Sequence, residues 1–103
     1  MGEIIYNITV KADSHIADEW LEWMLKIHIP QVLKTGCFTR YQMLKLLDQD
    51  ESAEPTYAVQ YYAASLDKYQ EYLSQHASSF RKEIVKKWGE HIVSFRTVME
   101  VLN

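Results

Sequence analysis

Apolar and polar residues alternate with a period of two near the N-terminus, over residues 3–11. Ile4, Tyr6, Ile8 and Val10 share one face, and most of the other face is polar. This period, together with β-branched side chains, is typical of a strand that is buried on one side. We therefore expect residues 3–11 to form the first strand of a sheet.

The spacing becomes helical over residues 12–30, where apolar residues recur every three or four positions. A proline disfavours the helical conformation of the residue before it, so we expect this helix to end by Ile29. His28 would then lie in the last turn, where the helix dipole favours a cation. The apolar stripe consists of Ile16, Trp20, Trp23, Met24 and Ile27.

A hairpin and a second helical region are expected next. Residues 38–47 and 56–64 have the composition of two strands joined by an acidic, turn-rich loop. Helical spacing then returns, with Ser65 as the N-cap and Gly89 as the residue that ends the helix. The pair Ser78-Ser79 marks either a kink or an uninterrupted stretch of this helix.

Residues 91–102 complete the pattern as a last strand. In it, Val93, Phe95, Met99 and Val101 share one face, and Ser94, Arg96 and Glu100 share the other. The resulting order predicts an α+β protein with the ferredoxin-like βαββαβ fold, in which two helices cover one face of a four-stranded antiparallel sheet.

The other face of the sheet has no cover within one chain. We expect Ile5, Val98 and Leu102 on it, among polar side chains. A second copy of the chain is a reasonable cover, which predicts a homodimer through the sheet face and hence a dimeric α/β barrel. The length of 103 residues predicts a single domain over residues 1–103.

Charge and composition exclude several classes of partner. The net charge of −3 offers no basic surface for nucleic acid. We find no apolar run long enough to cross a bilayer and no signal peptide, so no membrane association is expected. Cys37 is the only cysteine and cannot form an internal disulfide, which favours a cytoplasmic location.

Motifs for metals and cofactors are missing from the sequence. There is no H-E-x-x-H, no paired cysteines and no glycine-rich nucleotide loop, so neither a metal nor a cofactor is predicted. The segment 48–53 begins like a calcium loop but lacks the glycine and the glutamate that such a loop requires. We interpret it as a solvated turn.

The histidines are the strongest candidates for chemistry. We expect the first and third strands to run parallel, so that both helices point the same way. His28, His76 and His91 would then belong to one pole, with Arg40 and Tyr41 beside them. Our hypothesis is a polar pocket there, in which histidines accept a proton from a phenolic or enolic ligand. Its predicted residues are Tyr6, Trp23, His28, Tyr41, Tyr69 and His76.

Structural roles explain the same residues without a ligand. His28 could satisfy carbonyls at a helix end, and His76 could mark a kink. The tyrosine and tryptophan stripes could be core packing, since helical spacing alone produces them.

Several segments together resemble a known family. They are the Glu19-Trp20 pair, the His28-Ile29-Pro30 run, and the segments 38–44, 56–63, 72–77 and 94–101. In this order they are similar to an uncharacterised bacterial family of the dimeric α/β-barrel superfamily, which also includes cofactor-independent monooxygenases and haem-degrading enzymes. The resemblance implies a dimer with a small cavity between sheet and helices. A His-x-Pro after the first helix occurs near that cavity in several branches.

Three functional hypotheses remain open. The first is a homodimer that binds a small aromatic or hydrophobic molecule in the cavity, with a cofactor-independent monooxygenase as its enzymatic version. The second is a structural or protein-interaction module without ligand chemistry. A third, haem binding through His28 or His76, is weaker. A cavity of a few hundred Å³ lined by either histidine favours ligand binding, and a solid core favours the module.

Overall fold

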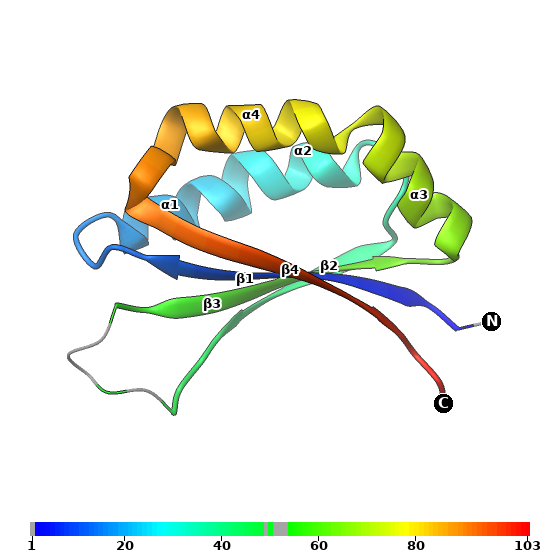
Figure 1. The fold of residues 1–103 in the computed structure, drawn as a ribbon, viewed down its shortest axis with the longest axis horizontal. Helices are drawn as coiled ribbons and strands as arrows, with labels where there is room; N and C mark the ends of the chain where they lie inside the picture. The colour runs from blue at the N-terminus through cyan, green and yellow to red at the C-terminus, as the bar shows by residue number, and fades with distance from the viewer. Residues whose placement is uncertain (1, 49, 51–53) are drawn as a thin grey trace.

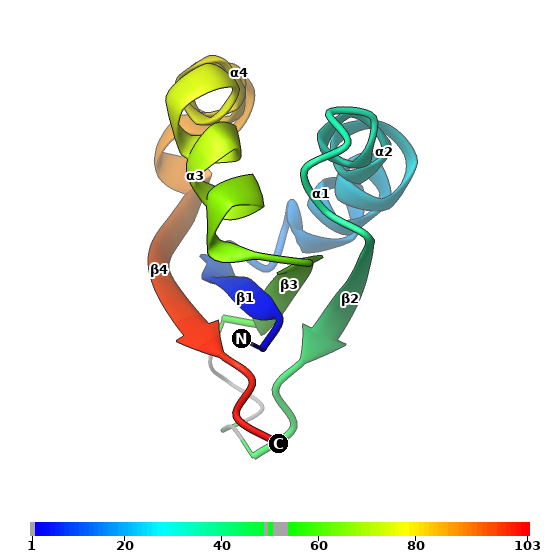
Figure 2. The same ribbon diagram turned by 90° about the vertical axis from the view of Figure 1, so that its right-hand side faces the viewer.

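The computed structural model describes residues 2–48, 50 and 54–103, so most of the calcium-like segment lies outside the described residues. The strands form one sheet in the order β2-β3-β1-β4. Every neighbouring pair is antiparallel, and the helices cover one face (Figures 1 and 2). This is the predicted α+β, ferredoxin-like βαββαβ fold. The strands are β1 (Ile4–Ala12), β2 (Arg40–Lys45), β3 (Thr56–Ala63) and β4 (Ile92–Glu100).

The helical layer consists of two antiparallel arms. The first arm contains α1 (Ala17–Trp23), the π-helical turn η1 (Met24–His28) and α2 (Ile29–Leu33). The second arm contains α3 (Leu66–Gln75), α4 (Ala77–Trp88) and the short 3₁₀ turn η2 (Gly89–His91). Among the described residues, no helix is both long and apolar enough to cross a membrane.

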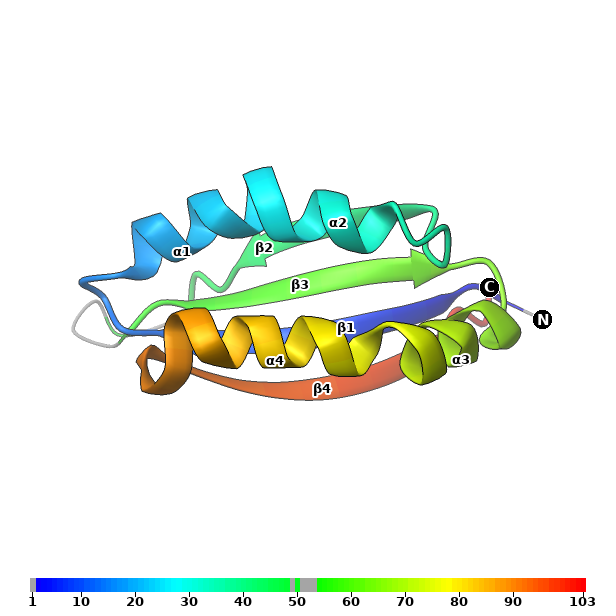
Figure 3. The ribbon, with the colours of Figure 1, turned by 90° about the horizontal axis from the view of Figure 1, so that it is seen from above.

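The two arms run in opposite directions, as Figure 3 shows. The expectation of parallel first and third strands is therefore wrong, because β1 and β3 are antiparallel neighbours. One consequence concerns His91. It precedes Ile92, which pairs with Ala12 at the end of β1, whereas Arg40 pairs with Tyr62 near the start of β1. His91 and Arg40 therefore lie at opposite poles of the sheet.

The register of β1 decides which side chains face the helices. Ile4, Tyr6 and Val10 are buried beneath the helical layer, as the alternation predicted. On β4, however, Val98 pairs with Tyr6 and lies on this covered face, so its expected place on the open face is wrong. The open face instead carries Phe95, opposite Thr9. Edge strand β4 is exposed on both sides, so its hydrophobic pattern could not tell the two faces apart.

The first helical arm does not end at Ile29, contrary to the prediction. Ile29 keeps helical dihedral angles, and its N–H donates to the carbonyl of Met24, five residues earlier. In an α-helix the ring of Pro30 would clash with a carbonyl of the preceding turn. The wider π-turn accommodates the proline, and the helix continues to Leu33.

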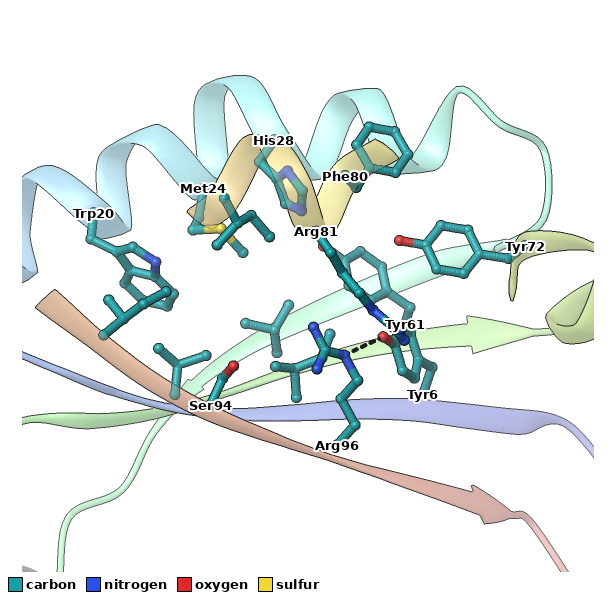
Figure 4. A pocket seen from close by; sticks show the side chains of 15 residues that line it. Tyr6, Trp20, Met24, His28, Tyr61, Tyr72, Phe80, Arg81, Ser94 and Arg96 are labelled. Carbon is teal, nitrogen blue, oxygen red and sulfur yellow. Dashed lines mark hydrogen bonds between the residues drawn. The ribbon is translucent and has the colours of Figure 1, made fainter. Parts of the chain in front are cut away.

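The π-turn also shifts the buried stripe by one residue. Ile27, which a regular helix would bury, is 47% exposed, whereas His28 and Ile29 are 4% and 1% exposed. His28 is therefore not in the last turn of the helix. It lies in its middle, and it points toward the sheet (Figure 4).

The second arm follows its predicted boundaries more closely. The hydroxyl of Ser65 accepts a hydrogen bond from the N–H of Lys68, 3.3 Å away, as an N-cap does. Gly89 ends α4 with a φ of 51°, a conformation that favours glycine. The break between α3 and α4 lies at His76, two residues before the predicted kink.

Candidate functional site

A cavity lies between the covered face of the sheet and the two helical arms (Figure 4). Its volume is about 50 Å³, counted as the space open to the centres of water molecules. Such a volume holds about three to five waters. Its walls are mainly apolar and aromatic. The polar and aromatic lining residues include Tyr6, His28, Tyr61, Tyr72, Arg81 and Arg96.

His28 contributes the buried polar group on the helical side. Its ring stacks on Trp23 at 5.1 Å between centroids and meets the edge of Phe80 at 5.4 Å. Its Nδ1 atom is buried and has no hydrogen-bond partner among the described residues. Burial lowers the pKa of His28 to about 4, so the imidazole is neutral at pH 7.

Tyr61 contributes the matching group on the sheet side. Tyr61 belongs to the central strand β3, and it is 1% exposed. The hydroxyl is buried without a hydrogen-bond partner in the described part of the chain. Burial raises the pKa of this phenol far above its usual range, and the neighbouring phenols of Tyr72 and Tyr6 raise it further. A buried polar atom without a partner carries the full cost of its lost hydration.

Two arginines converge on the phenol of Tyr6. The Nε atom of Arg96, on β4, donates to the Tyr6 hydroxyl at 2.8 Å. Arg81 reaches the same region from α4, as Figure 4 shows. Its pKa is raised, first through a hydrogen bond with Tyr6. Both arginines are exposed, so this part of the cavity lies near solvent, between α4 and β4.

The structure brings together some of the six predicted residues. Tyr6 and His28 line the cavity. Trp23 lies behind His28, and Tyr69 packs on Tyr6 with 5.4 Å between ring centroids, so both support the wall.

The remaining two predicted residues lie farther out. His76 stacks on Tyr72 at 6.2 Å between centroids but does not line the cavity. Tyr41 lies in a separate surface groove between α1 and β2.

Several lining residues were missed by the sequence reasoning. Nothing in the sequence distinguishes Tyr61 from the other residues of its predicted strand, or Tyr72 from the other residues of its predicted helix. Arg81 lies among other charged residues of the second predicted helical region, and Arg96 lies on the polar face of the last predicted strand. No signal within the last strand could have placed Arg96 on the covered face, because both sides of this edge strand are exposed.

A group of possible metal ligands lies outside this cavity. Asp13, His15 and His91 offer ligand atoms that all lie within 4.8 Å of one another at the surface. The Nδ1 atom of His91 is already hydrogen-bonded to Asp13 Oδ2 at 2.9 Å, which accounts for two of the three groups without an ion. A haem does not fit the cavity at His28, since pockets for ligands of that size need about 300 Å³ or more.

With this geometry established, comparison with known proteins places the chain in a family. Residues 3–102 match the family described as "Domain of unknown function (DUF4286)", and the chain belongs to it. This agrees with the uncharacterised family that the sequence segments indicated. A search among curated proteins found no match.

Solved structures share the fold over the whole chain. An EthD-like protein from Ralstonia eutropha has a TM-score of 0.71 at 15% identity, with 100% of this chain and 95% of that chain covered. SnoaB, a cofactor-independent oxygenase from Streptomyces nogalater, has a TM-score of 0.69 at 10% identity, with 100% of this chain and 96% of that chain covered. A dimeric ferredoxin-like protein from an uncultured marine organism has a TM-score of 0.68 at 6% identity, with 100% of this chain and 98% of that chain covered.

Proposed function

We propose that this protein is a homodimer that binds a small, mainly apolar molecule in the cavity between sheet and helices. The observation that carries this proposal concerns two buried polar atoms, His28 Nδ1 and the Tyr61 hydroxyl. Both lack a hydrogen-bond partner among the described residues, and both belong to residues that line the cavity from opposite layers. Buried polar groups are rarely left unpaired, and a ligand or ordered water would satisfy both.

The cavity volume limits the size of the ligand. At about 50 Å³ the cavity is neither the few hundred Å³ expected of a roomy pocket nor a solid core. A molecule with a few non-hydrogen atoms fits the space as it stands. A benzene-sized molecule needs about 150 Å³, so the cavity would have to widen to admit it.

Binding is favoured over proton transfer by the state of His28. A general base works best when its pKa lies near the working pH. The pKa of His28, at about 4, makes its imidazole a weak proton acceptor at pH 7. An oxygenase function, which the fold shared with SnoaB suggests, is therefore the second candidate. The neutral ring is well suited to hydrogen bonding with a bound molecule.

The open face of the sheet supports the dimer part of the proposal. Exposed apolar side chains lie on both edge strands of this face, at Leu44, Val93, Phe95 and Met99. Exposed apolar patches of this kind favour association, and a twofold pair buries the same face of both copies. The cytoplasm is the proposed compartment, since Cys37 is buried with a free thiol.

A fragment titration monitored by ¹H–¹⁵N NMR tests cavity binding. The probes are butyramide, phenol, indole and butyrate, each titrated into wild type and two neighbouring variants of α4. Ile84→Trp places an indole in the cavity wall, and Val85→Trp places it on the exposed side of the same helix.

We expect shifts of amides around the cavity in wild type and in Val85→Trp, and their loss in Ile84→Trp. If no fragment shifts these amides at about 10 mM, an affinity weaker than about −3 kcal/mol, the cavity is not a binding site. The alternative of a structural or protein-interaction module would then stand.

A further inference from the structure

We infer that the ligand of this cavity carries an anionic group, and that it is a short-chain or small aromatic carboxylate held by Arg81 and Arg96. This inference rests on the proposed function and specifies the chemistry of the same site. It starts from the charges around the cavity, which differ sharply from those of the whole chain.

The chain has a net charge of −3, yet two guanidinium groups line this one cavity. No aspartate or glutamate is found among its lining residues. Within the described part of the chain, neither Arg81 nor Arg96 forms an ion pair with a carboxylate. The group that they share is the hydroxyl of Tyr6, which is not a carboxylate.

Arg40, the third arginine of the chain, shows the contrasting arrangement. Its guanidinium lies 3.6 Å from the carboxylate of Glu3 and 3.5 Å over the ring of Tyr62. Arg40 is thus both paired with an acid and stacked on an aromatic ring. Arg81 and Arg96 lack the acid, and a ligand carboxylate would supply it.

Guanidinium geometry favours a carboxylate in this position. Each guanidinium presents parallel N–H donors that match the two oxygens of a carboxylate, and such charge-assisted hydrogen bonds are stronger than neutral ones. With its charged end at the exposed arginines, the ligand would extend its apolar part between Met24 and Val59. The buried polar atoms of His28 and Tyr61 are then available to a second polar group.

Matched acid and amide probes test the inference. Butyrate is compared with butyramide, and benzoate with benzamide, at pH 7 and constant ionic strength, by NMR titration of cavity amides. Each amide keeps the shape of its acid and lacks the charge. The variants are Arg81→Gln, Arg96→Gln and the double variant, with Arg40→Gln as the control for a general loss of positive charge.

We expect at least one acid to bind about tenfold or more tightly than its amide, as removal of charge-assisted hydrogen bonds does. Arg81→Gln and Arg96→Gln should each abolish most of this preference, and Arg40→Gln should preserve it. Arg81→Lys keeps the positive charge but loses the parallel N–H donors of the guanidinium group, so it should retain only part of the preference for the acid. Folded spectra of every variant confirm that the comparison concerns binding.

Other outcomes overturn the inference in distinguishable ways. If an acid and its amide bind equally, the cavity binds ligands without regard to charge, and only the carboxylate assignment fails. If the preference for acids survives Arg81→Gln and Arg96→Gln but falls in Arg40→Gln, the anions bind elsewhere on the surface. If neither acids nor amides perturb the cavity amides, the proposed function itself fails.

Discussion

The two faces of the sheet treat their polar side chains in opposite ways. On the open face, Gln60 donates to Asn7 at 3.2 Å, and Asn7 donates to Thr9 at 3.2 Å. The hydroxyl of Tyr62 bonds to Gln42 at 2.9 Å. On the covered face, the hydroxyl of Tyr61, the preceding residue of β3, has no partner within the described chain.

This contrast supports the roles proposed for the two faces. The open face satisfies its own hydrogen bonds and exposes apolar side chains, as a surface does that associates with another copy. The covered face is rich in aromatic rings and leaves polar atoms unsatisfied beside a cavity, as a binding site does. Four predictions test this division, and they follow in order of the size of the expected effect.

The largest effect is expected from Trp20→Ala beneath the helices. Trp20 is 1% exposed and packs on Tyr57 with 5.1 Å between ring centroids. Loss of such a side chain removes about 3–5 kcal/mol from the free energy of unfolding. Urea denaturation measures it. An equal loss in Phe95→Ala on the open face, measured at a protein concentration where the chain is monomeric, would contradict the division.

Protonation of His28 should lower the free energy of unfolding by about 3 kcal/mol as the pH falls. Its pKa is about 4 when folded and about 6.5 when unfolded. Between these values the unfolded chain binds more protons, so stability falls as the pH falls from 6.5 to 4. Urea denaturation across this pH range measures the free energy of unfolding at each pH. In His28→Phe this free energy should depend less steeply on pH than in wild type. Identical slopes in both proteins would show that His28 is not buried as a neutral ring.

The open face is tested by Phe95→Asp. Phe95 is 62% exposed in a single chain, and a charge there should weaken a dimer by about 2 kcal/mol or more. Sedimentation velocity over a dilution series measures the change. Val85→Asp, at a residue that is 67% exposed on α4, is the control. A wild-type chain that stays monomeric at every concentration would refute the dimer.

The smallest effects come from two adjacent tyrosines of β3. Tyr62→Phe breaks two hydrogen bonds on the open face, at 2.9 and 3.2 Å, and should cost about 1 kcal/mol. Tyr61→Phe removes an unpartnered hydroxyl and should leave stability unchanged or raise it by up to about 1 kcal/mol. Chemical denaturation compares the two. A Tyr61→Phe loss as large as that of Tyr62→Phe would mean that Tyr61 does have a partner.

Much of the architecture was predictable from local patterns. The alternation at Ile4, Tyr6 and Val10 correctly identified the buried side of β1, and Ser65 and Gly89 marked the ends of the second arm. These signals act within a few residues of one another. They depend on strand alternation, helix capping and the conformational freedom of glycine, all of which can be judged without knowledge of distant contacts.

The candidate site was only partly predictable because it depends on register over long sequence distances. The prediction that Pro30 ends the helix missed the π-turn, which places His28 inward and Ile27 outward. Arg96 meets Tyr6 although 90 residues separate them, because β4 pairs with β1 in a register that an exposed edge strand does not reveal in its own pattern.

The amino-acid sequence alone determined the order of strands and helices, the face of β1 that is buried and the placement of a histidine before a proline in the first helical arm. Only the tertiary structure decided that this histidine stays neutral beside a cavity. It also decided that two arginines, which have no acidic partner among the described residues, meet there. The reason is physical: periodicity records what each segment buries, whereas burial without a hydrogen-bond partner depends on which atoms the packed layers bring together.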